Sequence, residues 1–259
     1  MAGRSEHLWI LRNPLGRTLP MNDILIPTLG PTDWRRLLGD PDKHWVRGKS
    51  AFECAVSWEL ARRQERGLPD NVAHALDSHD ATRGARLLLG VPEHKVDIEG
   101  NGHASQNDLW ALLRLPSGTA SMAVEAKSGE PFDKLVAEWL RDAPINSKKP
   151  QRLEALKKTL GIAQANLDGI WYQLLHRTAS PLLEAKRFNA SVAIMLVQSF
   201  GGAADGKSFK DFEKFCALMA CQPIRNSVAL SAKKTDVPLL LGWVDCAPAT
   251  DKQVAESIE

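Results

Sequence analysis

Three charged residues, Asp108, Glu125 and Lys127, lie in a segment otherwise built of apolar and small residues. Asp108 precedes an apolar run that ends at Leu115, and Glu125 and Lys127 close a second run, two residues apart. Two carboxylates that meet at a strand end can hold a hard divalent cation such as Mg²⁺, which prefers oxygen ligands. A neighbouring ammonium can orient or deprotonate an attacking water and stabilise charge on a phosphoryl oxygen. These residue types therefore predict a site for phosphodiester hydrolysis.

A β-hairpin is the element that must bring the three charges together. Side chains alternate along a strand, so Glu125 and Lys127 share one face, about 7 Å apart, while Met122, Val124 and Ala126 point to the other. We expect the apolar face to enter the core. Small residues precede the two charges on their own face, which predicts open space in front of them.

The register of this hairpin decides whether the site exists. With the turn centred on Ser117 and Gly118, Asp108 lies opposite Lys127. A register shift of two residues would place Asp108 opposite Glu125 and would keep all three charges on one face. A shift of one residue would turn one strand over and separate them.

The rest of the chain has the pattern of an α/β protein with a mixed central β-sheet flanked by helices. The run 190–200 is apolar and rich in β-branched residues, as expected for a strand buried on both faces. The run 87–91 is compatible with a helix end or a first strand. Helices are predicted at 34–38, 49–67, 131–143, 151–160, 163–178 and 209–220, and further strands at 227–231 and 237–246.

Asp108, a gap of 16 residues and Glu-Ala-Lys at 125–127 together resemble the motif of the PD-(D/E)xK nuclease superfamily, although Asn107 stands where that motif has proline. The resemblance implies a restriction-endonuclease-like core of order α-β-β-β-α-β, which the chain order fits from about Lys49 to Phe200. It also implies a nuclease in which Asp108 and Glu125 hold Mg²⁺, with Mn²⁺ as a substitute, while Lys127 positions the attacking water. The implied substrate is nucleic acid, with DNA favoured over RNA.

Many members of that superfamily also use a glutamate from the helix before the hairpin. Glu59 falls within the apolar face of the predicted helix 49–67, where an acid needs a partner. Glu53 lies at the border of that face and equally suits a capping box with Ser50 as N-cap. Both glutamates are candidates for an auxiliary carboxylate.

Two polar segments could contact the substrate. His103, Ser105 and Gln106 lie in a loop just before Asp108, and the alternative for them is a polar surface loop. Lys148 and Lys149 belong to a basic stretch that could follow a nucleic-acid backbone. The alternative for these lysines is a solvated helix face.

Composition narrows the class of protein. The chain has 259 residues and a formal charge of +2, so contact with a polyanion must depend on local patches. No window approaches about 18 apolar residues, and Arg12 and Asn13 interrupt the first apolar run, so we expect a cytoplasmic protein with no membrane partner. We expect residues 1–48 to form a loop-rich N-terminal extension packed, through its tryptophans, on a nuclease-like domain of residues 49–259. A homodimer stays open.

Two other functions compete with the nuclease. One is a catalytically inactive nuclease fold that binds nucleic acid or protein. The other is a glycosidase-type acid and base pair formed by Asp108 and Glu125. Lys127 argues against this pair, because a cation there would keep both acids ionised.

Overall fold

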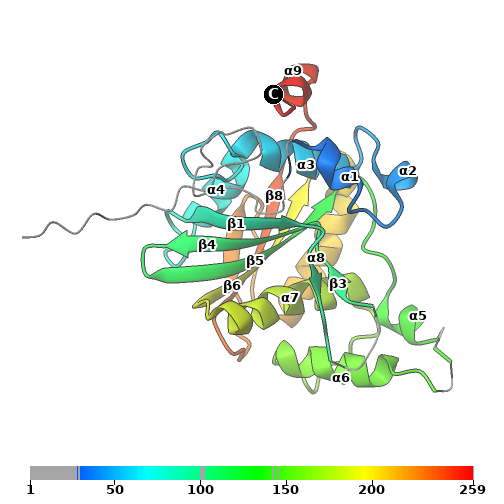
Figure 1. Cartoon of the computed structure of the whole chain (residues 1–259). Coiled ribbons are helices and arrows are strands. Elements are labelled where there is room, and N and C mark those ends of the chain that lie inside the picture. The colour runs from blue at the N-terminus through cyan, green and yellow to red at the C-terminus, as the bar shows by residue number, and fades with distance from the viewer. Residues whose placement is uncertain (1–27, 29, 100–102, 142, 145, 259) are drawn as a thin grey trace, which may run out of the picture.

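The computed structural model describes residues 28, 30–99, 103–141, 143–144 and 146–258 (Figure 1). Its main sheet has the strand order β1-β4-β5-β6-β8-β7. The first three strands in this order are antiparallel, β6 and β8 run parallel to β5, and β7 is antiparallel to β8. The strands are β1 Arg86–Pro92, β4 Leu109–Leu115, β5 Gly118–Lys127, β6 Val192–Ser199, β7 Ser227–Leu230 and β8 Leu239–Asp245, and a separate pair joins β2 Lys95–Val96 to β3 Ser105–Gln106.

Helices cover both faces of this sheet. The main ones are α3 Ser50–Ala61, α4 Asp70–Asp77, α6 Lys149–Thr159, α7 Tyr172–Phe188 and α8 Gly206–Leu218, and short ones are α1 Thr32–Arg35, α2 Pro41–His44, α5 Val136–Arg141, η1 Gly202–Asp205 and α9 Asp251–Glu256. One apolar core joins α3 and α4 to the sheet, and a second joins α6, α7 and α8 to its other face. Figure 1 shows α3 and α7 on opposite sides of the strands. The predicted mixed sheet flanked by helices is therefore confirmed.

The strand pattern explains how β5 and β6 are placed. Every residue of β6 is buried, as predicted for the central run, because helices cover both faces of the sheet there. On β5, Met122, Val124 and Ala126 enter the core beneath α3 and α4, as the alternation predicted. Glu125 and Lys127 consequently face α7.

The hairpin register differs by two residues from the one expected. Leu115 pairs with Gly118, so the turn residues are Pro116 and Ser117 rather than Ser117 and Gly118. A proline within the ladder would remove a hydrogen-bond donor, whereas it is favourable in a turn. Gly118 has a φ of +148°, a backbone angle that residues with a side chain rarely adopt. This angle explains why a glycine occupies this strand position.

The observed register keeps each side chain on the face of the hairpin where it was expected. Leu109 pairs with Val124, so continuing the ladder places Asp108 opposite Glu125. A shift of two residues exchanges neighbours without turning either strand over.

Several predicted boundaries were wrong. Helix α3 ends at Ala61 rather than near Gly67, and Lys49 rather than Ser50 is its N-cap. The helix expected at 163–178 is instead α7, because the turn-forming residues at 166–169 delay its start to Tyr172. The run 87–91 is a strand.

The expected extension of residues 1–48 falls mostly outside the described residues, including Arg12 and Asn13. In its described part, Trp34 is buried and Trp45 packs against the core beneath α3. Within the described ranges, no helix combines the length and the hydropathy needed to cross a membrane.

Candidate active site

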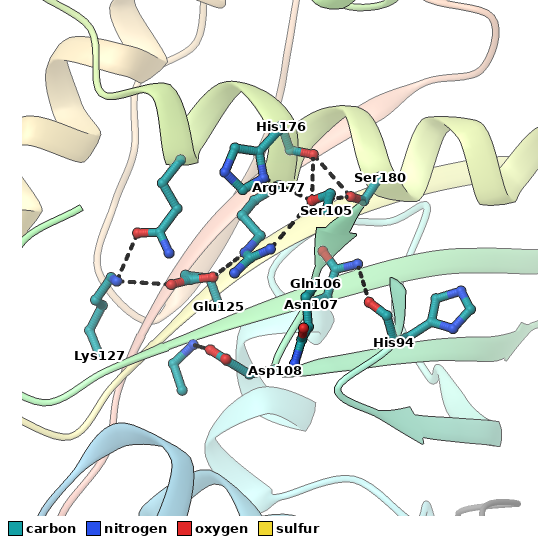
Figure 2. Close-up of polar contacts among 12 residues, drawn as sticks. His94, Ser105, Gln106, Asn107, Asp108, Glu125, Lys127, His176, Arg177 and Ser180 are labelled. Atoms are coloured by element: carbon teal, nitrogen blue, oxygen red, sulfur yellow. Dashed lines mark hydrogen bonds and ion pairs between the residues drawn. The ribbon is translucent and has the colours of Figure 1, made fainter. Parts of the chain in front are cut away.

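Glu125 and Lys127 lie at the end of β5, and α7 covers them. Each is only 3% exposed. Lys127 Nζ lies 2.8 Å from Glu125 Oε1, and Arg177 Nε donates to Glu125 Oε2 at 2.5 Å (Figure 2). Lys127 Nζ also donates to Gln173 Oε1 at 2.9 Å. The open space expected in front of the two charges is therefore filled by side chains of α7.

Helix α7 positions these side chains through its own periodicity. Gln173 and Arg177 are four residues apart, so they lie one above the other on one helical face. Ser180 continues this polar stripe and donates to Ser105 Oγ at 2.9 Å. The stripe faces the strand ends, where it meets the two charges of β5.

Asp108 joins the site from the end of β4. It is half-buried, and its Oδ2 accepts a hydrogen bond of 2.6 Å from the backbone N–H of Ala126. Burial raises the pKa of Asp108 well above its usual range, and the charges of Glu125 and Glu93 raise it further. In Figure 2 its carboxylate is turned onto the backbone of β5, next to Glu125.

Glu125 has the opposite titration. Burial alone would raise the pKa of its carboxyl, but the charges of Lys127 and Arg177 outweigh burial and hold this pKa below its usual value. Two neighbouring acids are thereby divided into one that keeps its proton to higher pH and one that stays ionised. Such a division is frequent where carboxyl groups perform chemistry.

Glu93 is a third carboxylate at this edge, and sequence reasoning missed it. It follows β1, and its Oε2 accepts a hydrogen bond of 2.7 Å from Gln106 Nε2. Burial raises the pKa of Glu93 to about 7, against the hydrogen bond from Gln106 and the charge of Arg177. Its backbone φ is +52°, an unusual value for a residue with a side chain, and its N–H donates to Asp108 O at 3.0 Å. Strained backbone of this kind is concentrated at functional sites.

The loop residues predicted to contact substrate are divided by the structure. Ser105 is buried, lies 2.8 Å from His176 Nδ1 and accepts a hydrogen bond of 3.3 Å from Arg177. Gln106 supports Glu93. His103 is exposed. Ser105 thus contacts Arg177, and Gln106 contacts Glu93.

The two lysines predicted to follow a nucleic-acid backbone differ in exposure and in contacts. Lys148 is exposed at the start of α6. Lys149 Nζ donates to Trp139 O at 2.6 Å and lies 5.1 Å from the centroid of its ring, so it fastens α5 to α6. Between these two lysines, Lys148 is the one whose charge faces solvent.

The two candidate glutamates of α3 have partners of their own. Glu59 accepts hydrogen bonds from Thr28 Oγ1 and Trp34 Nε1, both at 2.7 Å, and from Arg62 at 3.0 Å. Glu53 accepts from the backbone N–H groups of Gly48 at 2.8 Å and Ala249 at 2.6 Å. These contacts fasten the chain before α3, at Thr28, Trp34 and Gly48, and the C-terminal segment, at Ala249, to α3. The structure does not bring either carboxylate into contact with Asp108, Glu125 or Lys127.

Asp205 stabilises the backbone just after Lys127. Its carboxylate is fully buried and accepts hydrogen bonds from Gly129 N, Ser199 Oγ and Gly201 N, at 2.6, 2.6 and 2.9 Å. It therefore connects the end of β5 to the end of its parallel neighbour β6.

The carboxylates of the site could hold a divalent cation only as a small group of protein ligands. Among the described residues, no three side chains of His, Cys, Asp or Glu form a metal-binding group. Mg²⁺ usually takes only one or two protein carboxylates and completes its shell with water and phosphate oxygens. Only Oδ2 of Asp108 accepts a hydrogen bond from the described part of the chain, and Oδ1 is thus available. Asp108 and Glu125 fit such an ion if Arg177 releases Glu125.

One family model matches most of the chain. The family model described as "Domain of unknown function (DUF6946)" matches residues 27–248, and the chain belongs to this family. No curated protein and no solved structure matches the chain. The match includes all strands of the main sheet and every residue of the candidate site.

Proposed function

We propose that the chain is a metal-dependent nuclease that hydrolyses phosphodiester bonds, with DNA as the favoured substrate. The observation that carries this proposal is the hairpin end, where Asp108 Oδ2 accepts from the backbone N–H of Ala126, next to Glu125, and the ammonium of Lys127 lies 2.8 Å from Glu125 Oε1. When α4, α5, α6 and the separate pair β2–β3 are set aside, the remaining order α3, β1, β4, β5, α7, β6 is compatible with the α-β-β-β-α-β core that the resemblance implies, and this supports the same proposal.

Each group has a distinct task. Asp108 and Glu125 would hold Mg²⁺, which when bound supplies a Lewis acid for the phosphoryl oxygen. Lys127, fixed between Glu125 and Gln173, positions the attacking water and stabilises negative charge that develops on the phosphate. Burial beneath α7 strengthens these electrostatic interactions, because water screens them less.

The charge of the site suits this substrate. A bound cation would favour the ionised forms of Glu93 and Asp108. Three carboxylates, Glu93, Asp108 and Glu125, would then face two cations, Lys127 and Arg177, and leave one negative charge before the metal ion itself is counted. A divalent cation converts this to one positive charge, which a single phosphodiester neutralises. The cluster is thus complementary to one metal ion together with one phosphate group.

Cleavage of DNA and RNA by the purified chain in Mg²⁺ or Mn²⁺ tests the proposal. We expect Lys127→Ala to reduce the cleavage rate at least a hundredfold, because one charged donor at a developing charge commonly contributes that much. Lys252→Ala, which removes an 84% exposed lysine from α9, is the matched control and should cut like the parent. Melting curves of both variants report folding. A folded Lys127→Ala variant that cuts at the parental rate would exclude this site.

The competing function is a nuclease fold that has lost catalysis and binds nucleic acid or protein. One observation favours it, since both carboxylate oxygens of Glu125 are already held by cations. Titration with Mn²⁺ separates the two functions. If the parent binds Mn²⁺ and Asp108→Asn does not, the result supports the nuclease. If the parent itself binds no Mn²⁺, the result supports the binding protein.

A further inference from the structure

Arg177 occupies the carboxylate that the proposed metal ion needs. Its Nε donates to Glu125 Oε2, while Lys127 already provides a positive charge at Glu125 Oε1. Both carboxylate oxygens of Glu125 are thus held by cations. A metal ion can take Oε2 only after the guanidinium of Arg177 has left it.

We propose that Arg177 is a phosphate-binding residue of this site, whose guanidinium leaves Glu125 when a divalent cation binds there and then contacts the phosphodiester. This inference rests on the proposed nuclease function and names a further residue for it. It assigns the two cations around Glu125 different tasks, with Lys127 acting on the water and Arg177 on the phosphate.

The surroundings of Arg177 allow this movement. Its other hydrogen bond, from Nη1 to Ser105 Oγ, is long at 3.3 Å. Ser105 Oγ keeps His176 Nδ1 at 2.8 Å and Ser180 Oγ at 2.9 Å when Arg177 departs. The buried hydroxyl of Ser105 is therefore not left without a partner. The Arg177 side chain is 11% exposed, so it is not completely enclosed.

The chemistry of the arginine side chain also suits phosphate binding. The guanidinium is planar, stays charged, and presents donors in a fork that matches two phosphate oxygens. Helix α7 keeps Arg177 one turn from Gln173, which holds Lys127. Both cations thus act from adjacent positions on one substrate group.

Two measurements on Arg177→Met test the inference without relying on cleavage. Calorimetric titration with Mn²⁺ alone should show metal binding about tenfold tighter than in the parent, because a competing charged hydrogen bond is removed. Binding of a short labelled DNA duplex, with saturating Ca²⁺ so that binding rather than cutting is measured, should weaken about tenfold. A purely structural arginine would not change these two affinities in opposite directions.

Arg187→Met is the matched control, because Arg187 lies on the same helix with a side chain 65% exposed. It should leave both affinities at the parental values. Arg177→Lys keeps the charge without the fork, and it should retain parental Mn²⁺ affinity while weakening duplex binding. Melting curves verify that each variant is folded.

The outcomes separate this inference from the proposed function. If Asp108→Asn removes Mn²⁺ binding but Arg177→Met and Arg177→Lys both bind metal and duplex like the parent, Arg177 has no task in phosphate binding. The same conclusion follows if Arg177→Met weakens both affinities. If Mn²⁺ binding in the parent is insensitive to Asp108→Asn, the proposed metal site itself is wrong.

Discussion

Buried carboxylates occur in two regions of this molecule, on helix α3 and at the end of the β4–β5 hairpin. Glu53 and Glu59 of α3 are 1% and 4% exposed, and Glu125 of the hairpin is 3% exposed. On burial alone, the three residues are equivalent. Their hydrogen-bond donors differ. Glu53 accepts from backbone N–H groups, and Glu59 accepts from an indole, a hydroxyl and the partly buried Arg62. Glu125 contacts two cations, the buried Lys127 and the partly buried Arg177.

This difference separates architecture from a candidate site. Three of the donors around the α3 glutamates, Thr28, Trp34 and Ala249, come from segments distant in sequence, and these pairings hold separate parts of the fold together. At the hairpin, three acids and two cations lie close enough for their charges to shift one another's pKa values. Such mutual electrostatic influence, more than burial, indicates where chemistry can occur.

Glu59→Gln is the strongest test of this comparison. The amide group would face the donors that Glu59 now accepts from, so we expect the free energy of unfolding to fall by about 2 kcal/mol, measured by urea denaturation. Cleavage by the folded variant should stay parental. The control is Glu154→Gln, at a side chain 66% exposed, with an expected change within about 0.5 kcal/mol. Loss of cleavage without loss of stability would move Glu59 into the catalytic site.

Glu93→Gln has a smaller effect that depends on pH. The folded pKa of Glu93 is about 7, above its value in an unfolded chain, so folded protein holds the proton more tightly. The stability from that proton is present below pH about 4.5 and is lost as pH rises through 7. We therefore expect Glu93→Gln to exceed the parent in stability by about 1 kcal/mol at pH 8, and to lack the parental decline.

Urea denaturation from pH 5 to 8 measures this difference. Glu99→Gln, at an exposed glutamate, should follow the parental profile throughout. Parallel profiles for Glu93→Gln and the parent would show that Glu93 titrates like an ordinary surface acid.

Lys148→Ala tests the smallest effect, at the exposed start of α6. Lys148 is exposed, so its loss should weaken duplex binding about twofold to threefold and reduce the slope of affinity against salt by about one. Fluorescence anisotropy across a salt series measures both. Lys252→Ala, far along the chain on α9, should change neither. An unchanged salt slope for Lys148→Ala would place the nucleic acid elsewhere.

Much of the fold could be predicted from local patterns. The continuous apolar run that became β6 and the alternation along β5 both reflect burial by neighbouring elements. The assumption of a two-residue turn predicted correctly which side chains share a face of the hairpin. It did not predict which residues pair across the two strands. Pro116 carried the missing information, since a proline belongs in the turn rather than in the ladder.

Glu93 and Arg177 were missed because their partners are distant in sequence. Glu93 looked like a loop residue after an apolar run, and only the sheet places it beside Asp108. A signal for Arg177 was present, since the polar residues at 173, 177, 180 and 184 recur at helical spacing on a mostly buried helix. The helix start was predicted nine residues too early, which obscured this stripe.

Asp205 has a consequence for the timescale on which the site can open. Strand ends ordinarily fray, and amide protons there exchange with solvent through small local openings. Because Asp205 binds Gly129 N, Ser199 Oγ and Gly201 N together, we expect the ends of β5 and β6 to open as one cooperative unit. Amide exchange near Lys127 should then be slower than at a strand end without such a link.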